Sequence, residues 1–190
     1  MADYLEILGA VGYYQGGPAL GIQVCLEGIS LESDHMVERL KAIKSTAFDA
    51  EIARLQRGSL KNTAHIQWLQ VENRFSPMGV KMIGVFCQEI RKLNFIDPQK
   101  YIAGFQIIPN EIPGFREIRF DEVKISMRVP PNLEEKIKLE NAEPLNTFLP
   151  EATSRLGGFS DACHRLAAAT TLAIGKEKEL IAEMERILGK

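Results

Sequence analysis

The sequence has few cysteines, no long apolar run and no surplus of basic residues, and each of these absences excludes a class of protein. The three cysteines, Cys25, Cys87 and Cys163, lie far apart and form no CxxC pair, which argues against a disulfide framework and a structural zinc. No apolar run approaches the roughly 20 residues of a membrane helix, and no secretory leader opens the chain. These features predict a soluble cytoplasmic protein that does not bind a membrane.

The charge of the chain is close to balance. Its 190 residues include 23 basic and 25 acidic residues, which give a formal net charge of -2. Nucleic-acid-binding proteins usually carry a basic surplus, because phosphates supply most of the attraction. Any contact with DNA or RNA should therefore be local, weak or shared with a partner protein.

Residues with metal-binding chemistry are scattered rather than clustered. The carboxylates form no HxD, DxD or DHH group, and neither His35 nor His65 has a partner at ligand spacing. Cys163 stands next to His164, but successive side chains of a strand point apart and no acid follows to orient the imidazole. The pattern therefore predicts no metal site, no cofactor and no thiol nucleophile.

The spacing of apolar residues predicts an α/β (α+β) protein, with a mixed β-sheet and flanking helices after an N-terminal helical subdomain. Residues 1–62 are expected to be helical, and residues 63–190 are expected to form the α/β domain. The expected helices are residues 3–12, 33–45 (capped by Ser33 or Asp34), 48–57, 80–93, 142–156 and 176–188, and the expected strands are residues 66–71, 101–108, 118–129 and 166–174.

A first candidate site lies on the strand near residue 125. The two-residue period of a strand puts Lys124, Ser126 and Arg128 on one face, about 7 Å apart. Such a row suits a phosphate backbone, because arginine binds phosphate oxygens with two N–H groups and lysine supplies a point charge. The alternative is the ordinary solvated face of a half-buried strand.

A second candidate site spans residues 155–171. Arg155 precedes the pair Gly157 and Gly158, and His164 and Arg165 precede a run of small residues. Exposed N–H groups of a glycine turn can form an anion nest, and small side chains let a ligand approach the backbone. The alternative is a helix that ends at the two glycines, followed by a strand packed tightly under a helix.

Residues 66–188 resemble the C-terminal, DHH-associated domain of the RecJ-like phosphoesterases. The run V-K-I-S-M-R at 123–128 is similar to that domain's K-[VI]-S-x-R strand, and H-R-L-A-A-A-T at 164–170 is similar to its H-x-x-A-A-G-A signature. The closing helix at 176–188 stands in the expected place. The run G-A-V-G-Y-Y at 9–14 is similar to the G-A-x-G-D segment near the end of the catalytic DHH domain. The resemblance therefore implies that residues 1–62 are a remnant of that domain and its connecting helix.

Departures from the family pattern bear on activity. In the family, aspartates and histidines of the DHH domain hold two metal ions that activate water, and none of those motifs is present here. Tyr13 stands where relatives have aspartate. Ala162, Cys163 and Ala169 stand where glycines are expected, and their β-carbons lie where the backbone would approach a phosphate. The resemblance thus implies a protein that is not an enzyme.

The implied function is that of a catalytically inactive RecJ-like scaffold in DNA replication. The resemblance is to archaeal RecJ-like proteins that lack the DHH domain, and it implies association with the GINS complex and the MCM helicase, a nucleoid-associated location, and weak contact with single-stranded DNA. That contact would use Lys124, Arg128, Arg155 and Arg165. Two alternatives stay open: a fragment or subunit of a RecJ-like metal-dependent single-stranded-DNA exonuclease or phosphodiesterase, and a stand-alone module that binds single-stranded nucleic acid.

Overall fold

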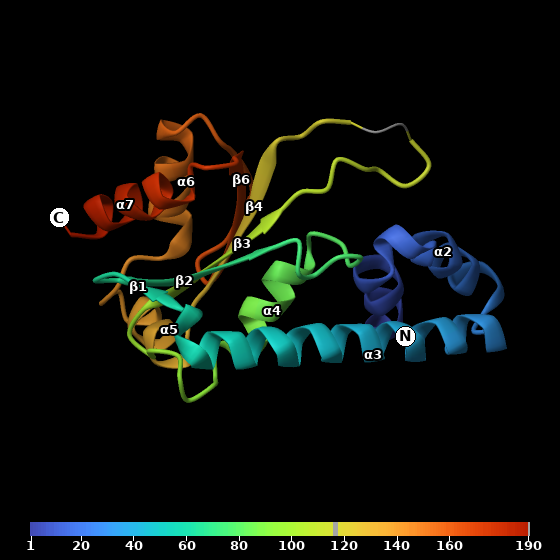
Figure 1. Ribbon diagram of the computed structural model, residues 1–190. Coiled ribbons are helices and arrows are strands. Elements are labelled where there is room, and N and C mark those ends of the chain that lie inside the picture. Colours follow the sequence, from blue (N-terminus) through green and yellow to red (C-terminus); the bar gives the residue numbers. More distant parts are fainter. Residues whose placement is uncertain (116–117, 190) are drawn as a thin grey trace.

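The computed structural model describes residues 1–115 and 118–189 and confirms the α/β class (Figure 1). Helices flank a mixed six-stranded sheet. The helices are α1 (Ala2–Glu6), η1 (Ile7–Val11), η2 (Tyr13–Gln15), α2 (Gly17–Glu27), α3 (Leu31–Arg54), η3 (Leu55–Ser59), α4 (Met82–Ile90), α5 (Pro131–Lys138), α6 (Leu145–Arg155) and α7 (Glu177–Leu188). The strands are β1 (Lys61–Asn62), β2 (Ile66–Glu72), β3 (Tyr101–Ile107), β4 (Glu122–Arg128), β5 (Phe159–Cys163) and β6 (Ala167–Ala173).

The first part of the chain is mainly helical up to Ser59, whereas Lys61–Asn62 form strand β1 because they pair with β2, and the helices differ from those expected. The two helices expected at 33–45 and 48–57 are one continuous helix, α3, because residues 46–47 contain no helix breaker. Its N-cap is Ser30, whose hydroxyl accepts from the backbone of Ser33 in a capping box, so Ser33 and Asp34 lie inside the helix. Helix α2 was not expected, because its glycines and Pro18 suggested a break. Pro18 sits in the first turn, where its missing N–H costs no hydrogen bond.

The sheet has the strand order β1-β2-β3-β4-β6-β5. Strands β2 and β3 are parallel and are connected through α4, whereas every other neighbouring pair is antiparallel. The register sets Ser126 of β4 between Gly104 of β3 and Ala169 of β6. Residues with small side chains therefore flank the centre of β4 on both sides.

One face of the sheet, here called the α6 face, is covered by α5, α6 and α7. Its core contains Val123, Ile125 and Met127 of β4, which are fully buried against residues of these helices such as Leu149 and Leu180. Burial of apolar side chains on this scale is the main source of stability for a domain of this size. The sequence period assigned these β4 residues to one face, and they pack there together.

The other face, here called the α4 face, carries α4, α3 and the N-terminal helices. Its core joins Leu40 and Phe48 of α3 to Phe86 of α4. Helix α4 approaches the sheet closely because Gly104 has no side chain: a β-carbon there would lie 2.5 Å from Sγ of Cys87. The N-terminal helices thus share a core with the sheet through α4.

Three further segments differ from the expectation. Residues 118–121 are not part of a strand, and Asp121 has a φ of 47°, outside the β region. Helix α5 was not expected after Pro130, but Pro131 occupies its first turn. Residues 159–163, which were read as part of a glycine loop, form the edge strand β5 because they pair with β6.

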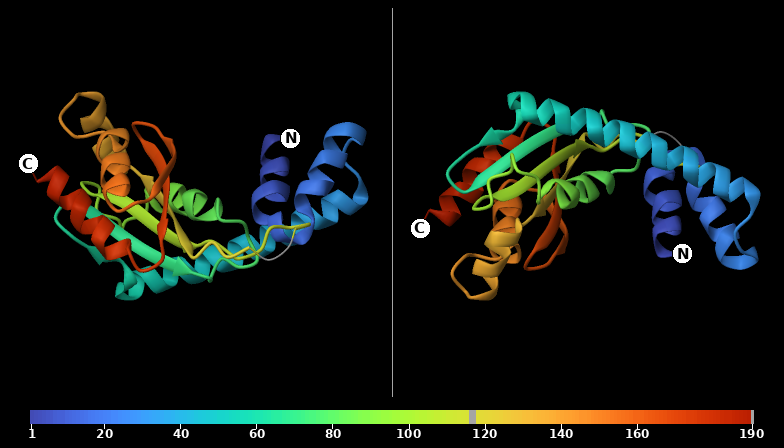
Figure 2. Two further views of the ribbon diagram at one scale, coloured as in Figure 1. Left: turned by 90° about the horizontal axis from the view of Figure 1, so that it is seen from above. Right: turned by 90° about the horizontal axis from the view of Figure 1, so that it is seen from below.

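Figure 2 shows the molecule as elongated, with α3 running from the N-terminal helices to the sheet. The N-terminus lies at the end with α2, and the C-terminus lies at the end with α7. Within residues 1–115 and 118–189, no helix has the length and apolar character of a membrane span.

Candidate phosphate-binding site

The row of Lys124, Ser126 and Arg128 lies on the α4 face, as the strand period predicts. Helix α4 covers Arg128 and Ser126 of this row. A β-carbon on Gly84 of α4 would meet Nη2 of Arg128 at 2.9 Å and Oγ of Ser126 at 3.0 Å. Lys124 and Arg128 are half-buried and Ser126 is buried. The row is therefore a partly covered surface under a helix and not an open solvated face.

His164 is exposed and lies just beyond the end of β5, at the edge of the sheet. Its backbone N–H donates to the carbonyl of Ala167 at 2.9 Å, and Ala167 pairs with Arg128. The backbone of His164 is therefore held at the turn from β5 into β6, near the Arg128 end of β4.

Arg128 has the charge environment expected of an anion-binding group. Its Nη1 donates to the carbonyl of Met127 at 2.8 Å, and no carboxylate in the described parts of the chain lies within ion-pairing distance. Burial lowers the pKa of the guanidinium. A half-buried cation whose lost hydration is replaced only in part, here by one hydrogen bond to a backbone carbonyl, favours the binding of an external anion.

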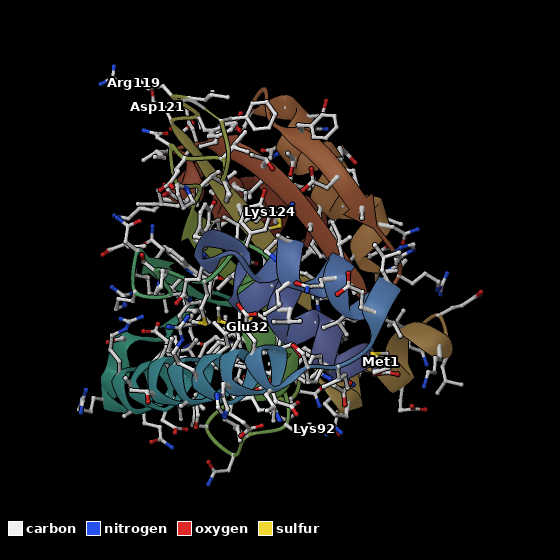
Figure 3. The ribbon with its side chains drawn as sticks, turned by 90° about the vertical axis from the view of Figure 1, so that its right-hand side faces the viewer. Met1, Glu32, Lys92, Arg119, Asp121 and Lys124 are labelled. Atoms are coloured by element: carbon white, nitrogen blue, oxygen red, sulfur yellow. The ribbon has the colours of Figure 1, made fainter. Side chains whose placement is uncertain are left out.

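Lys124 differs from Arg128, because a carboxylate contacts it. Its ammonium forms an ion pair with Asp161 of β5, although burial lowers the pKa of Lys124. In Figure 3, Lys124 is seen in projection between the N-terminal helices and the strands near the C-terminus. Lys124 is thus paired with a carboxylate of the chain, whereas Arg128 has no carboxylate partner among the described residues.

The remaining predicted site residues lie elsewhere. Arg155 is exposed on α6 and pairs with Glu151 at 2.5 Å and Glu183 at 2.7 Å. Arg165 donates to the carbonyl of Ile137 of α5 at 3.1 Å. Both arginines are therefore engaged with helices of the α6 face, away from the row of β4.

Gly157 and Gly158 end α6 and lie next to the start of β5. Gly157 has a φ of 75°, so it forms the left-handed helix end for which glycine is favoured. A β-carbon on Gly158 would lie 2.6 Å from the carbonyl oxygen of Thr171, which means that tight packing requires this glycine. The two glycines lie at the other end of β5 from His164, so the structure does not bring them together.

Two polar residues near the row were not predicted. Asp161 was missed because β5 was read as a loop, which gave its side chain no defined direction. Gln106 of β3 pairs with Lys124 in the sheet and is 3% exposed, and its Oε1 has no partner among the described residues. The two-residue period of β3 could have placed Gln106 on the α4 face.

The described residues contain no group of three His, Cys, Asp or Glu side chains placed to hold a metal ion. Burial raises the pKa of the Cys163 thiol, which keeps it protonated. His65, which was expected to be structural or solvated, makes a contact of 2.7 Å with Glu185. The chemistry that this geometry supports is the binding of an anion on the α4 face.

Comparison with known proteins finds similarity of structure only. No protein-family profile matches the sequence, and no curated protein matches it. The chain is similar to CDC45 from Entamoeba histolytica, with a TM-score of 0.54 at 8% identity, over 99% of this chain and 37% of that one. It also aligns with the pGpG-specific phosphodiesterase PggH from Vibrio cholerae (TM-score 0.49, 13% identity, 96% of this chain and 57% of that one).

A third alignment is with the C-Ala domain of alanyl-tRNA synthetase from Aquifex aeolicus (TM-score 0.47, 11% identity, 69% of this chain and 98% of that one). The match to CDC45 spans little more than a third of that protein. At these identities the similarity concerns the fold alone, and the match to CDC45 is one of overall fold over nearly the whole of this chain.

Proposed function

We propose that the protein is a RecJ-like binding subunit without nuclease activity, which contacts the phosphates of single-stranded DNA on the α4 face. The observation that carries the proposal is the half-buried guanidinium of Arg128, which has no carboxylate partner among the described residues and lies on the same strand face as Ser126. Arginine recognises phosphate through paired N–H donors, and a partly desolvated site strengthens such bonds.

The role in replication is supported by the fold. CDC45, the RecJ-like protein of eukaryotes, matches the chain over nearly its whole length. The sequence resemblance adds the GINS complex and the MCM helicase as partners, and with them a nucleoid-associated location. The formal net charge of -2 fits a subunit that binds DNA together with its partner proteins.

Equilibrium binding of a fluorescent 12-nucleotide oligo(dT) tests the DNA contact. The wild type and the R128M and H164A variants are compared by fluorescence anisotropy over a range of salt concentrations. We expect R128M to weaken binding by about tenfold and to lower the slope of log K against log salt by about 0.7, because one phosphate contact is lost. R39M is the matched control, since Arg39 is exposed on α3 and its Nη2 contacts the sulfur of Met36.

Co-elution of the chain with the purified GINS complex of its source organism tests the partner. A complex that survives gel filtration at about 0.15 M salt is expected. Manganese-dependent release of nucleotides from single-stranded DNA by the purified chain would contradict the inactive role and favour the exonuclease alternative. Unchanged DNA binding by both R128M and H164A would contradict the assignment of the α4 face.

A further inference from the structure

The edge strand β5 contains an extra residue. Ser160 pairs with Thr170 and Ala162 pairs with Ala169, so two steps along β5 correspond to one step along β6. Asp161 is the residue between them. A β-bulge of this kind changes the direction of a side chain and bends the strand. The bulge therefore decides where the Asp161 carboxylate points.

The carboxylate of Asp161 points across β6 to the α4 face, where it forms an ion pair with Lys124. The side chains of the pair are 18% and 30% exposed, so the pair is shielded on one side and open to water on the other. A carboxylate resembles a phosphate in charge and in the oxygen atoms that it offers to an ammonium group. Asp161 thus occupies a position on Lys124 that a phosphate would need.

We propose that Asp161 is a built-in competitor for the phosphate-binding row: its carboxylate neutralises Lys124 and lowers the affinity of the α4 face for nucleic-acid phosphates. This inference rests on the proposed function of that face. Asp161 leaves Arg128 as the cation of the row that has no carboxylate partner in residues 1–115 and 118–189. It therefore restricts the contact to the Arg128 end of β4, which pairs with Ala167 of β6.

A purely structural role would explain the pair less well. Partly exposed ion pairs contribute little to stability, because water screens them. Strand β5 is held instead by its pairing with β6, and Gly158 at its start packs against Thr153 and Thr171. Replacing Asp161 by the nearly isosteric asparagine should therefore leave the fold intact while removing one negative charge from the site.

The test compares the affinity of the wild type and D161N for the fluorescent 12-nucleotide oligo(dT) at about 50 mM salt. We expect D161N to bind about three- to tenfold more tightly and the slope of log K against log salt to become steeper by about 0.7, because Lys124 gains a phosphate contact. In the double variant D161N/K124M the slope should return to the wild-type value. E135Q is the matched control, because Glu135 pairs with Lys138 at 2.9 Å on α5 of the opposite face.

The outcomes separate this inference from the proposed function. The role of Asp161 is overturned if D161N has the same affinity and the same salt slope as the wild type while R128M still lowers the affinity and the slope. The proposed site on the α4 face would then still stand. An equal gain in E135Q would show a general effect of net charge and would also overturn it. If neither the wild type nor D161N binds, both proposals fail. If circular dichroism shows that D161N does not fold, D161S replaces it in the same binding measurements.

Discussion

The carboxylate of Glu185 connects the last helix of the chain to the start of β2. Its Oε1 accepts from the hydroxyl of Thr63 at 2.5 Å and from the backbone N–H groups of His65 and Ile66 at 2.8 and 3.1 Å. Its Oε2 lies 2.7 Å from Nδ1 of His65. Replacing Glu185 by alanine would leave the N–H groups of His65 and Ile66 without this acceptor, whereas the hydroxyl of Thr63 could still donate to the carbonyl of Ile66 at 2.8 Å.

The cost can be estimated from the number of bonds. Hydrogen bonds to a charged group contribute about 1.5–3 kcal/mol each, and a donor left unsatisfied loses its desolvation free energy. The Glu185 side chain is 18% exposed, so water replaces part of what is lost. We expect E185A to lower the free energy of unfolding by about 3 kcal/mol, which corresponds to a fall in Tm of about 6–12 °C for a chain of this size.

The effect should depend on pH with a definite sign. Burial would raise the pKa of Glu185, but the hydrogen bonds from Thr63 and His65 outweigh it, and the pKa is lowered. A carboxylate with a lowered pKa contributes stability above its unfolded value, about 4.3, and loses it as the pH falls through the folded value. The difference in unfolding free energy between wild type and E185A should therefore shrink as the pH falls below about 4.

Urea unfolding at several pH values, followed by circular dichroism, measures both quantities. E179A is the control, since Glu179 lies on the same helix and pairs with Lys176 at the surface, and it should change stability by less than about 0.5 kcal/mol. A loss in E185A no larger than in E179A would refute the reasoning. So would a difference that stays constant down to pH 3.

Two further changes test the core of the α4 face. E51Q should lower the free energy of unfolding by about 2–3 kcal/mol in urea titrations, because the Glu51 carboxylate is 1% exposed and bonds Arg54 at 2.6 Å and Arg74 at 3.0 Å, which are themselves partly solvated. A loss below about 0.5 kcal/mol would contradict this. G104A should cost about 1–3 kcal/mol by overpacking against Cys87, and a Tm equal to that of the wild type would contradict that contact.

The fold class could be predicted because it depends on the spacing of apolar residues along the chain. The elements that were missed are those in which packing or strand pairing outweighs the local sequence preference. The alternation of β4 assigned Ile125 and Met127 to the core correctly. Helix α2 was missed because glycine and proline lower helix propensity, whereas the burial of Leu20 and Val24 stabilises it. Strand β5 was missed because its residues have no apolar alternation and its place is set by pairing with β6.

The candidate site was predictable only in part, for a similar reason. Lys124, Ser126 and Arg128 follow one another at a fixed period, so their common face could be deduced without tertiary information. The position of Asp161 on that face depends on the pairing of β5 with β6 and on its bulge. Sequence spacing alone does not determine the register of such a hairpin.

The charge state of the row leads to a conclusion about how the protein works. Lys124 is paired with Asp161, Arg155 with two glutamates, and Arg165 with a carbonyl. Arg128 and Arg165 have no carboxylate partner in the described chain, but Arg165 lies against α5 of the opposite face, so Arg128 is the one of the two that belongs to the row on β4. One phosphate contact corresponds to a salt slope of about 0.7 and to weak binding. Under the proposed function, a chain with this arrangement would need further contacts from another protein to hold single-stranded DNA at physiological salt, and the proposed role of a subunit in a larger assembly would supply them.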